Sequence, residues 1–252
     1  MKIGALITAR LKSTRLTKKV LRPLGGRPMI SHLIDRMRRV HLADTVVVIT
    51  STVEQDDELA EYTVGYGVEC YRGDPEDVLY RMSCAAREND LDWVVSVTAD
   101  NPWVSPEWTD RLVMKAISSD LDFAKTEGLP FGAFSYVLKC SAIERACELK
   151  MSRDTEMWGG CFNDKYGFRL GTLNVPSDSP VFRPGYRLTV DTHEDFSLAE
   201  EIISRLPAND RKYPRHLDEI TNLLDQNPNL PKFNEKVVQA PAKVIEMRQD
   251  AF

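Results

Sequence analysis

The chain has 252 residues, of which 42% are apolar and 28% are charged, so it can bury one sizeable core. This composition excludes a disordered or low-complexity chain. No uninterrupted apolar run approaches the roughly 20 residues that a membrane-spanning helix needs. The five cysteines are odd in number and contain no CxxC pair, which argues against a disulfide framework and a zinc site. We therefore expect a cytoplasmic protein with no membrane partner.

The formal net charge of −5 disfavours nucleic acid as a partner, but the charge is unevenly distributed. Residues 1–40 contain eleven Lys or Arg and a single acid, Asp35, which gives this segment +10 and leaves −15 for the rest of the chain. A cationic beginning on an acidic protein predicts a local anion site.

Strands and helices are expected to alternate over the first 118 residues. Apolar runs of the length of buried parallel strands occupy 3–8, 45–50, 68–71 and 93–98. Helical spacing follows them, from starting points near Pro28, Thr52, Pro75 and Pro106. The alternation predicts βαβ units and an α/β fold with a mostly parallel sheet flanked by helices.

After residue 120 the alternation weakens. Strands are expected at 134–138 and 168–175, with a helix at 141–149 between them. We interpret the stretch from about 126 to 175 as an inserted α+β lobe that binds an acceptor or makes a dimer. A homodimer is expected from the apolar side chains of this lobe, which are Phe131, Phe134, Tyr136, Met157, Trp158 and Phe162.

The regular pattern resumes with an expected strand at 186–190 and a helix at 193–206. Residues 227–252 contain three prolines and little periodicity, so they are expected to form an extended tail. The sequence thus predicts one domain over residues 1–226, which includes the inserted lobe, followed by that tail.

The loop after the first expected strand carries the strongest chemical signal. Ligands of open parallel sheets bind at the carboxyl ends of strands, and this loop begins at such an end. Arg10, Arg15 and Lys19 supply cationic donors, and Ser13 and Thr14 add hydroxyl groups, a combination that suits a triphosphate. The signatures of a dinucleotide fold and of a P-loop ATPase are absent. The simpler interpretation is a basic surface loop.

Two aspartates also follow expected strands. Asp100 comes after the strand at 93–98, and Asp191 after the strand at 186–190. Mg²⁺ is usually held by one or two carboxylates together with substrate phosphates. The two aspartates and the cationic loop therefore predict metal-assisted transfer at a nucleoside triphosphate. Each aspartate also has a structural interpretation, as a turn residue before Pro102 or as a helix N-cap.

In their order along the chain, these motifs resemble the CMP-sugar synthetase group, which includes the cytidylyltransferases for 3-deoxy-octulosonate and for acylneuraminates. The closest resemblance is to the spore-coat polysaccharide cytidylyltransferase branch. The matching segments are 9–19, 26–30, 72–81 and 187–196. The resemblance implies a Rossmann-like nucleotidyltransferase fold for residues 1–226.

The resemblance also implies roles for individual residues. Six residues at the end of the first strand and in its loop would bind the nucleotide: Thr8, Ala9, Arg10, Ser13, Arg15 and Lys19. Arg72 and Asp77 would line its base and ribose, and Asp100 and Asp191 would hold Mg²⁺. The residues implied in catalysis are Arg10, Lys19 and Asp100.

The implied activity is transfer of CMP from CTP to a small anionic acceptor, with release of pyrophosphate, in the synthesis of a surface polysaccharide or another glycan. A sugar acid, a phosphate and a phosphonate all stay open as the acceptor, because the family's central motifs, in the lobe that normally meets the acceptor, are replaced here by 128–133 and 153–156. One alternative is a uridylyl- or guanylyltransferase acting on a sugar 1-phosphate, although those enzymes usually begin with a glycine-rich loop. A nucleotide-sugar-dependent glycosyltransferase would carry a DxD pair, which 100–102 does not supply. A non-catalytic nucleotide-binding subunit is a third.

Overall fold

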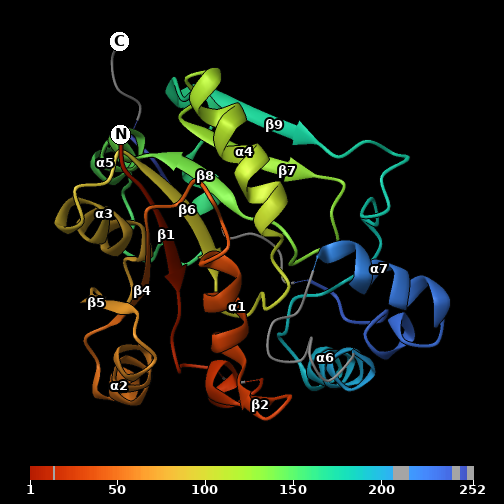
Figure 1. Cartoon of the computed structure of the whole chain (residues 1–252). Helices are drawn as coiled ribbons and strands as arrows, with labels where there is room; N and C mark the ends of the chain where they lie inside the picture. The colour runs from red at the N-terminus through yellow and green to blue at the C-terminus, as the bar shows by residue number, and fades with distance from the viewer. Residues whose placement is uncertain (14, 207–215, 240–244, 249–252) are drawn as a thin grey trace.

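The computed structural model describes residues 1–13, 15–206, 216–239 and 245–248 (Figure 1). Its centre is a seven-stranded sheet with the order β5-β4-β1-β6-β8-β7-β9. Four of these strands are mutually parallel: β1 (Ile3–Thr8), β4 (Thr45–Ser51), β5 (Glu69–Gly73) and β6 (Trp93–Thr98). The four strands expected in the first hundred residues are confirmed, with small shifts at their ends.

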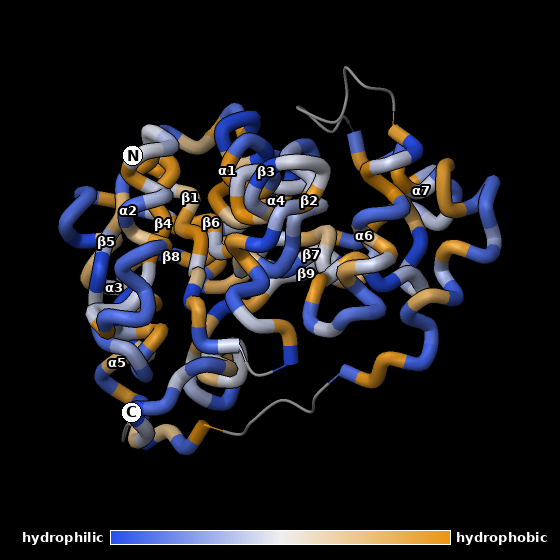
Figure 2. The backbone as a smooth tube through the Cα atoms, turned by 90° about the horizontal axis from the view of Figure 1, so that it is seen from below, coloured by the Kyte–Doolittle hydropathy of each residue, from blue (hydrophilic) through white to orange (hydrophobic). Residues whose placement is uncertain are grey.

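Strand β1 shows why the sequences of the parallel strands are unbroken apolar runs. Ile3, Ala5 and Ile7 point into the core on one face of the sheet, whereas Leu6 points into the core on the other face. Successive side chains of a strand point to opposite faces, so a strand covered on both sides needs apolar residues at every position. Figure 2 shows these apolar strands inside the molecule, with hydrophilic segments around them.

Helices cover both faces of the sheet (Figure 1). One core is shared by helices α1 (Met29–Met37), α2 (Asp57–Gly65), α4 (Pro106–Ser118), α6 (His193–Arg205) and α7 (Leu217–Gln226). The opposite core contains α3 (Val78–Glu88) and α5 (Cys140–Leu149). Helix α4 begins at the expected Pro106, because Ser105 accepts a hydrogen bond from the Trp108 amide.

The second half of the chain completes the same sheet. Strand β8 (Tyr136–Lys139) pairs antiparallel with β6 and with β7 (Phe123–Glu127), and β9 (Leu170–Asn174) pairs parallel with β7. Within the stretch interpreted as an inserted lobe, β8 and β9 therefore belong to the main sheet. The shorter elements are β2 (Pro23–Leu24), β3 (Arg27–Pro28), η1 (Lys19–Leu21), η2 (Glu54–Asp56), η3 (Trp158–Cys161), η4 (Asp164–Tyr166) and η5 (Pro231–Phe233).

The aromatic residues that suggested a dimer surface lie largely inside this chain. Trp158 and Phe162 are buried, and both rings contact Phe123 of β7. Tyr136 packs edge-on against Trp158, with ring centroids 5.7 Å apart. These side chains fill the second core together with helix α5, whose Ala142, Ile143 and Ala146 are buried in the same core.

The C-terminal segment packs against the domain in two places. Leu230 is buried in the first core, next to η5. Residues 245–248 run beside the end of α5, where the Met151 amide donates to the Glu246 carbonyl at 2.8 Å. Ile245 and Met247 are buried in the second core. Pro241, one of the prolines that suggested an extended tail, lies outside the described residues.

No helix in the described ranges has both the length and the apolar character required to cross a bilayer.

Candidate active site

A single ammonium group joins two carboxylates at one edge of the sheet. Lys19 Nζ donates hydrogen bonds to Asp100 Oδ2 at 3.0 Å and to Asp191 Oδ1 at 2.8 Å. The Lys19 side chain is 15% exposed and that of Asp191 is 10% exposed, so water screens these pairs only partly. The loop after β1 and both predicted aspartates therefore meet at one point.

The backbone of the loop places Lys19 at this point. Leu11 and Leu16 are buried, and they fix the loop to the first core. The Lys19 amide donates to the Leu16 carbonyl at 3.1 Å, which closes the turn before η1. A basic loop on two apolar anchors holds its cations in place, whereas a freely solvated loop would not.

Asp100 is oriented by residues beside it at the end of β6. Thr98 Oγ1 donates to Asp100 Oδ1 at 2.6 Å, and Asn101 Nδ2 donates to Thr98 Oγ1 at 2.7 Å. The Ala99 amide donates to the Thr8 carbonyl at 2.9 Å, which ties this turn to the end of β1. These contacts leave Asp100 Oδ2 directed at Lys19.

Asp191 reaches the site by a different route from the one predicted. Residues 186–190 were expected to form a strand, but they form only one isolated bridge, between Phe131 and Arg187. The segment is held by the loop at Phe131, whose carbonyl accepts from the Leu188 amide at 2.7 Å. The Val190 amide then donates to the Asp100 carbonyl at 2.8 Å, which sets Asp191 beside Asp100.

Gly132 makes this approach of two loops possible. Its φ is +92°, and a Cβ atom there would lie 2.4 Å from the Thr189 amide nitrogen. Any larger residue would be strained and would also push the 187–190 segment away. The position of Asp191 therefore depends on a glycine almost sixty residues before it.

Three cations surround Asp191. Besides Lys19, Arg187 Nη2 lies 3.0 Å from Oδ2 and Arg15 Nη2 lies 3.6 Å from Oδ1. Burial acts to raise the pKa of Asp191, but Lys19, Arg15 and Arg187 together hold that pKa below its ordinary value. Burial likewise acts to lower the pKa of Lys19, and Asp100 and Asp191 raise it instead. Lys19 and Asp191 are thus both ionised at neutral pH.

Arg10 points away from this cluster, towards the turn after β5. Its Nη1 donates to the Pro75 carbonyl, and its Nε lies 3.6 Å from Asp56 Oδ2. Asp56 Oδ1 also accepts from the Leu11 amide at 2.7 Å. Arg10 therefore links the loop after β1 to the turns that follow β4 and β5, where the base of a nucleotide was expected.

Arg72 and Asp77, the residues expected at the base and ribose, both have partners within the chain. Arg72 donates to the Ser51 carbonyl at 3.0 Å and to Asp57 Oδ1 at 2.6 Å. Asp77 is buried as the N-cap of α3, where it pairs with Lys150. The structure does not bring these two side chains to the Lys19 cluster.

The remaining predicted nucleotide ligands lie along the first part of the loop. Thr8 Oγ1 is buried without a hydrogen-bond partner, and Ala9 is buried. Ser13 Oγ accepts from the Leu16 amide at 3.4 Å. Thr14 lies outside the described residues.

Two residues that the sequence did not single out as site residues, Arg187 and Asp195, hydrogen-bond the side chain and the backbone amide of Asp191. Arg187 and Asp195 are four positions on either side of Asp191, and Arg187 Nε donates to Asp195 Oδ1 at 2.8 Å. That spacing is the signal that could have identified them. Asn234 also binds Asp195, but nothing in its sequence surroundings indicates this contact.

The two aspartates fit a divalent cation that is bound together with a nucleotide. Among the described residues no three His, Cys, Asp or Glu side chains gather into a complete metal site. Mg²⁺ does not need one, because phosphate oxygens and water complete its shell. Lys19 already sets a positive charge between Asp100 and Asp191, so both carboxylates face a common cation position.

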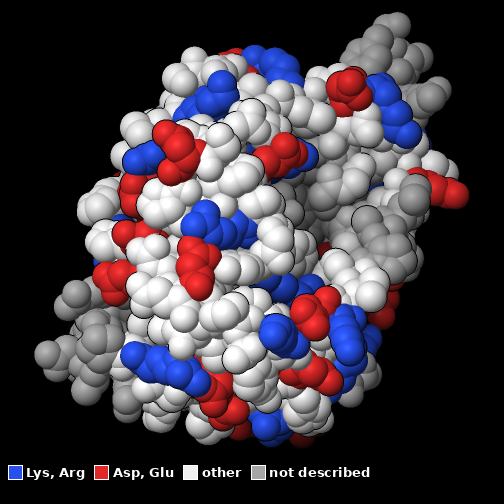
Figure 3. All heavy atoms as spheres, turned by 90° about the vertical axis from the view of Figure 1, so that its right-hand side faces the viewer, with Lys and Arg blue, Asp and Glu red and all other residues white. Residues whose placement is uncertain are grey.

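Charge on the surface is mixed. Figure 3 shows one face of the molecule, on which basic and acidic side chains are interspersed instead of being separated by sign. In the basic segment 1–40, Lys18 and Arg27 pair with Glu58 and Asp35. Neighbouring carboxylates therefore neutralise part of the positive charge of residues 1–40.

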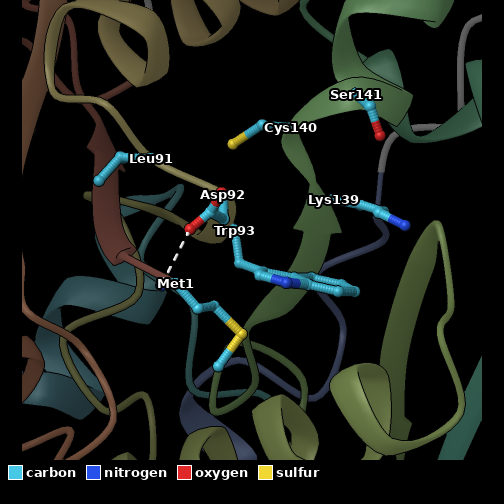
Figure 4. A pocket seen from close by; sticks show the side chains of 7 residues that line it. All are labelled: Met1, Leu91, Asp92, Trp93, Lys139, Cys140 and Ser141. Carbon is cyan, nitrogen blue, oxygen red and sulfur yellow. Dashed lines mark ion pairs between the residues drawn. The ribbon is translucent and has the colours of Figure 1, made fainter.

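A surface pocket at the opposite edge of the sheet lacks such chemistry (Figure 4). It measures about 390 Å³ and lies where β1 and β6 begin. Its carboxylate, Asp92, already contacts the Met1 amino group at 3.5 Å and accepts from the Lys2 amide at 2.6 Å. Ligands of parallel sheets bind where strands end, so the Lys19 cluster is the candidate active site.

The fold and this charged cluster are those expected of a nucleotidyltransferase. Comparison with known proteins specifies the nucleotide. The Cytidylyltransferase family matches residues 4–202, most of the chain. The chain belongs to this family and is a CTP-dependent nucleotidyltransferase.

Two curated relatives align with most of the chain, and a third aligns with less than half of it. An uncharacterized protein of Methanocaldococcus jannaschii is 30% identical over 98% of this chain and 100% of its own length. The spore coat polysaccharide biosynthesis protein SpsF of Bacillus subtilis is 30% identical over 89% of this chain and 94% of its own. The 3-deoxy-manno-octulosonate cytidylyltransferase of Geobacter sulfurreducens is 34% identical, over 45% and 44% of the two chains.

Solved structures confirm the predicted fold. A cytidylyltransferase of Leptospira borgpetersenii superposes with a TM-score of 0.83 at 22% identity, covering 96% of this chain and 100% of its own. A CMP:2-keto-3-deoxy-manno-octonic acid synthetase complexed with CTP gives a TM-score of 0.66 at 17% identity, covering 81% and 99%. The resemblance to a Rossmann-like nucleotidyltransferase is thus correct.

Proposed function

We propose that this enzyme transfers CMP from CTP to a sugar acid in a Mg²⁺-dependent reaction, and that the product serves the synthesis of a surface polysaccharide or a related glycan. One observation carries the proposal. Lys19 of the loop after β1 bridges Asp100 and Asp191, so a phosphate-binding cation and two metal-binding carboxylates share one site. A triphosphate and a divalent cation need these groups side by side.

In the proposed reaction an acceptor oxygen forms a bond to the α-phosphorus of CTP. The bond from that phosphorus to the α–β bridging oxygen breaks, and the oxygen leaves with pyrophosphate. The protein needs to align the two substrates and to neutralise charge on the phosphoryl group and on the leaving group. Arg15 and Lys19 supply positive charge for the leaving group. Arg10 orients the loop that carries them, through its contacts with Pro75 and Asp56.

Asp100 and Asp191 would hold the divalent ion, which when bound would polarise the α-phosphoryl oxygen. For Lys19 to reach the triphosphate, its ammonium group exchanges carboxylate partners for phosphate oxygens. No general base is assigned: an ionised acceptor oxygen has no proton to lose, and the proton of an acidic acceptor hydroxyl would pass to water. His193 is exposed at the start of α6 and takes no role in the scheme.

We place the acceptor next to Phe131, within the stretch 126–175. The Phe131 ring is 37% exposed, and the Arg187 guanidinium lies 5.5 Å from its centroid. Arg187 in turn contacts Asp191, so the ring adjoins the proposed metal site. An exposed aromatic ring suits the apolar face of a sugar. The named relatives that act on 3-deoxy-manno-octulosonate support a sugar acid as the acceptor.

We also retain a homodimer, and a cytoplasmic location where CTP is available, as part of the proposal. With Trp158 and Phe162 buried, the large apolar residues that stay exposed in the stretch 126–175 are Phe131, Met151, Met157 and Leu170. Light scattering of the purified protein tests the homodimer, which a monomer at micromolar concentration would exclude.

The activity is tested by pyrophosphate release. The purified protein is incubated with each of the four nucleoside triphosphates, with Mg²⁺ or Mn²⁺, and with a panel of sugar acids, sugar phosphates and phosphonates. Release that requires CTP, a divalent ion and a sugar acid supports the proposal. Release with a phosphate or phosphonate in place of the sugar acid would overturn the assigned acceptor class.

A further inference from the structure

Asn234, in the segment that follows α7, reaches the back of the active site. Its side chain is 3% exposed. Nδ2 donates to the Arg187 carbonyl at 3.0 Å and to Asp195 Oδ1 at 2.8 Å. A buried amide with both donors aimed at residues that neighbour Asp191 points to a function beyond the packing of a tail.

Asp195 does more than cap helix α6. The capping box with Thr192 accounts for one amide donor on Oδ2, at 3.1 Å. Asp195 Oδ2 also accepts from the Asp191 amide at 2.9 Å, and Oδ1 accepts from Arg187 Nε at 2.8 Å. The side chain is fully buried, so these partners fix its position without help from water.

Arg187 transmits this order to the Asp191 side chain. Arg187 Nη2 donates to Asp191 Oδ2 at 3.0 Å, which leaves Oδ1 facing Lys19. The remaining Nη1 donates at 2.7 Å to Gln239 Oε1, five residues beyond Asn234. One guanidinium group is therefore held by Asp195, by Asp191 and by the C-terminal segment.

We infer that residues 234–239 are part of the active site, and that Asn234 is a positioning residue that fixes Asp191 for divalent-cation binding through Asp195 and Arg187. The inference rests on the proposed function, because it takes Asp191 as a metal ligand. Groups that orient metal ligands typically change metal affinity or activity by about 10- to 100-fold when they are mutated.

The test compares Asn234→Ala with Asn89→Ala. Asn89 is also buried, and its Nδ2 also donates to one carboxylate and one carbonyl, those of Glu69 and Ala85. It lies at the end of α3, outside the cluster around Asp191. Both variants lose a comparable pair of hydrogen bonds, so a difference between them reports on position and not on stability.

Binding of Mn²⁺ in the presence of CTP and without acceptor is followed by electron paramagnetic resonance, and thermal unfolding is measured alongside. For Asn234→Ala we expect the Mn²⁺ dissociation constant to rise about ten-fold, with a smaller change for Asn89→Ala at a similar loss of thermal stability. Asn234→Asp keeps the shape but presents a carboxylate to Asp195, so it is expected to weaken Mn²⁺ binding at least as much. Wild-type Mn²⁺ affinity in both Asn234 variants would overturn the inference.

Gln239→Ala carries the test if Asn234→Ala is too unstable to purify. Gln239 contributes a single hydrogen bond to Arg187, so the expected rise in the Mn²⁺ dissociation constant is about two- to three-fold, and an unchanged constant would count against the inference.

Asp191→Asn separates this inference from the proposed function. If Asp191→Asn binds Mn²⁺ as tightly as the wild type, the proposed metal site is wrong, whereas loss of binding in Asp191→Asn alone rejects only the role of Asn234.

Discussion

Asp100 and Asp191 meet at one lysine, but the two regions that hold them are built differently. Asp100 follows β6, which pairs with β1 along its whole length. Asp191 follows a segment with one isolated bridge, held by the Phe131 loop and by side chains from the end of the chain. One carboxylate is placed by a regular sheet, the other by individual tertiary contacts.

The Asp100 side of the site is held by a paired strand, whereas the Asp191 side depends on a few hydrogen bonds. Sheet hydrogen bonds are numerous and cooperative, so single changes near β6 leave the Asp100 backbone in place. The Asp191 side depends on Gly132, Arg187 and Asp195. Substitutions on that side are therefore expected to disturb the site more.

The largest effect tests whether the two aspartates act together. Asp100→Asn and Asp191→Asn are each expected to lower kcat/KM for CTP by roughly 10²–10³-fold, because each removes a negative charge needed to hold the metal ion. Pyrophosphate release measures this, with the surface variant Asp225→Asn as the control. A loss confined to one aspartate would show that the two regions do not form a single site.

Removal of the shared cation probes both regions at once. Lys19→Met is expected to lower kcat/KM by about 10²-fold, because the leaving group loses its charge. It also leaves Asp100 and Asp191 facing each other without the ammonium, so Mg²⁺ should raise the Tm of this variant by roughly 2–4 °C more than that of the wild type. Differential scanning fluorimetry with and without Mg²⁺ checks the shift.

Lys18→Met is the control for Lys19→Met, because Lys18 pairs with Glu58 outside the cluster. We expect near wild-type activity and the wild-type response to Mg²⁺. A stronger Mg²⁺ response in the Lys18 variant than in the Lys19 variant would refute the shared cation position.

The core that α1 shares with β1 and β6 contains a pH-sensitive group, His32. Arg27 can only donate, so His32 Nδ1 accepts from it at 3.2 Å while Nε2 donates to the Leu24 carbonyl at 2.8 Å. This pattern requires a neutral ring. Burial first, and then the Arg27 charge, lower the pKa of His32 to about 4.

The direction of the pH dependence follows from the linkage between protonation of His32 and folding. An unfolded histidine has a pKa near 6.5, so the stability that His32 contributes is complete above that pH and is lost as the pH falls towards 4. The full loss is about 3 kcal/mol. Urea unfolding at pH 7 and pH 5 should show less pH dependence for His32→Gln than for the wild type. An unaltered pH dependence in His32→Gln would contradict this account.

The smallest expected effect isolates the contact that positions the Asp191 region. Gly132→Ala and Gly26→Ala both place a side chain at positive φ, +92° and +88°, but only the first meets other atoms within 4 Å. We expect a loss of about 2–3 kcal/mol in the free energy of unfolding for Gly132→Ala and about 1 kcal/mol for Gly26→Ala. Chemical denaturation measures the difference, and activity should fall only in the Gly132 variant. Equal losses would mean that the approach of Gly132 to Thr189 does not matter.

Local sequence patterns were enough to predict the parallel strands of the first hundred residues and the side of the site that contains Lys19 and Asp100. The apolar runs of β1 and β6 predicted buried parallel strands, and the rule that ligands bind where such strands end placed both the Lys19 loop and Asp100 at one edge. These features depend on local patterns of hydrophobicity, which can be read without knowing which residues meet.

The other features depend on contacts that form only in the folded chain. Residues 186–190 are held by the Phe131 loop and do not form the expected strand. Asp77 forms an ion pair with Lys150, and the side chains of Trp158 and Phe162 are buried. Asn234 also donates a hydrogen bond to Asp195. Each of these outcomes is a contact between residues far apart in the chain, and hydrophobic periodicity carries no information about the partner of a particular polar or aromatic side chain.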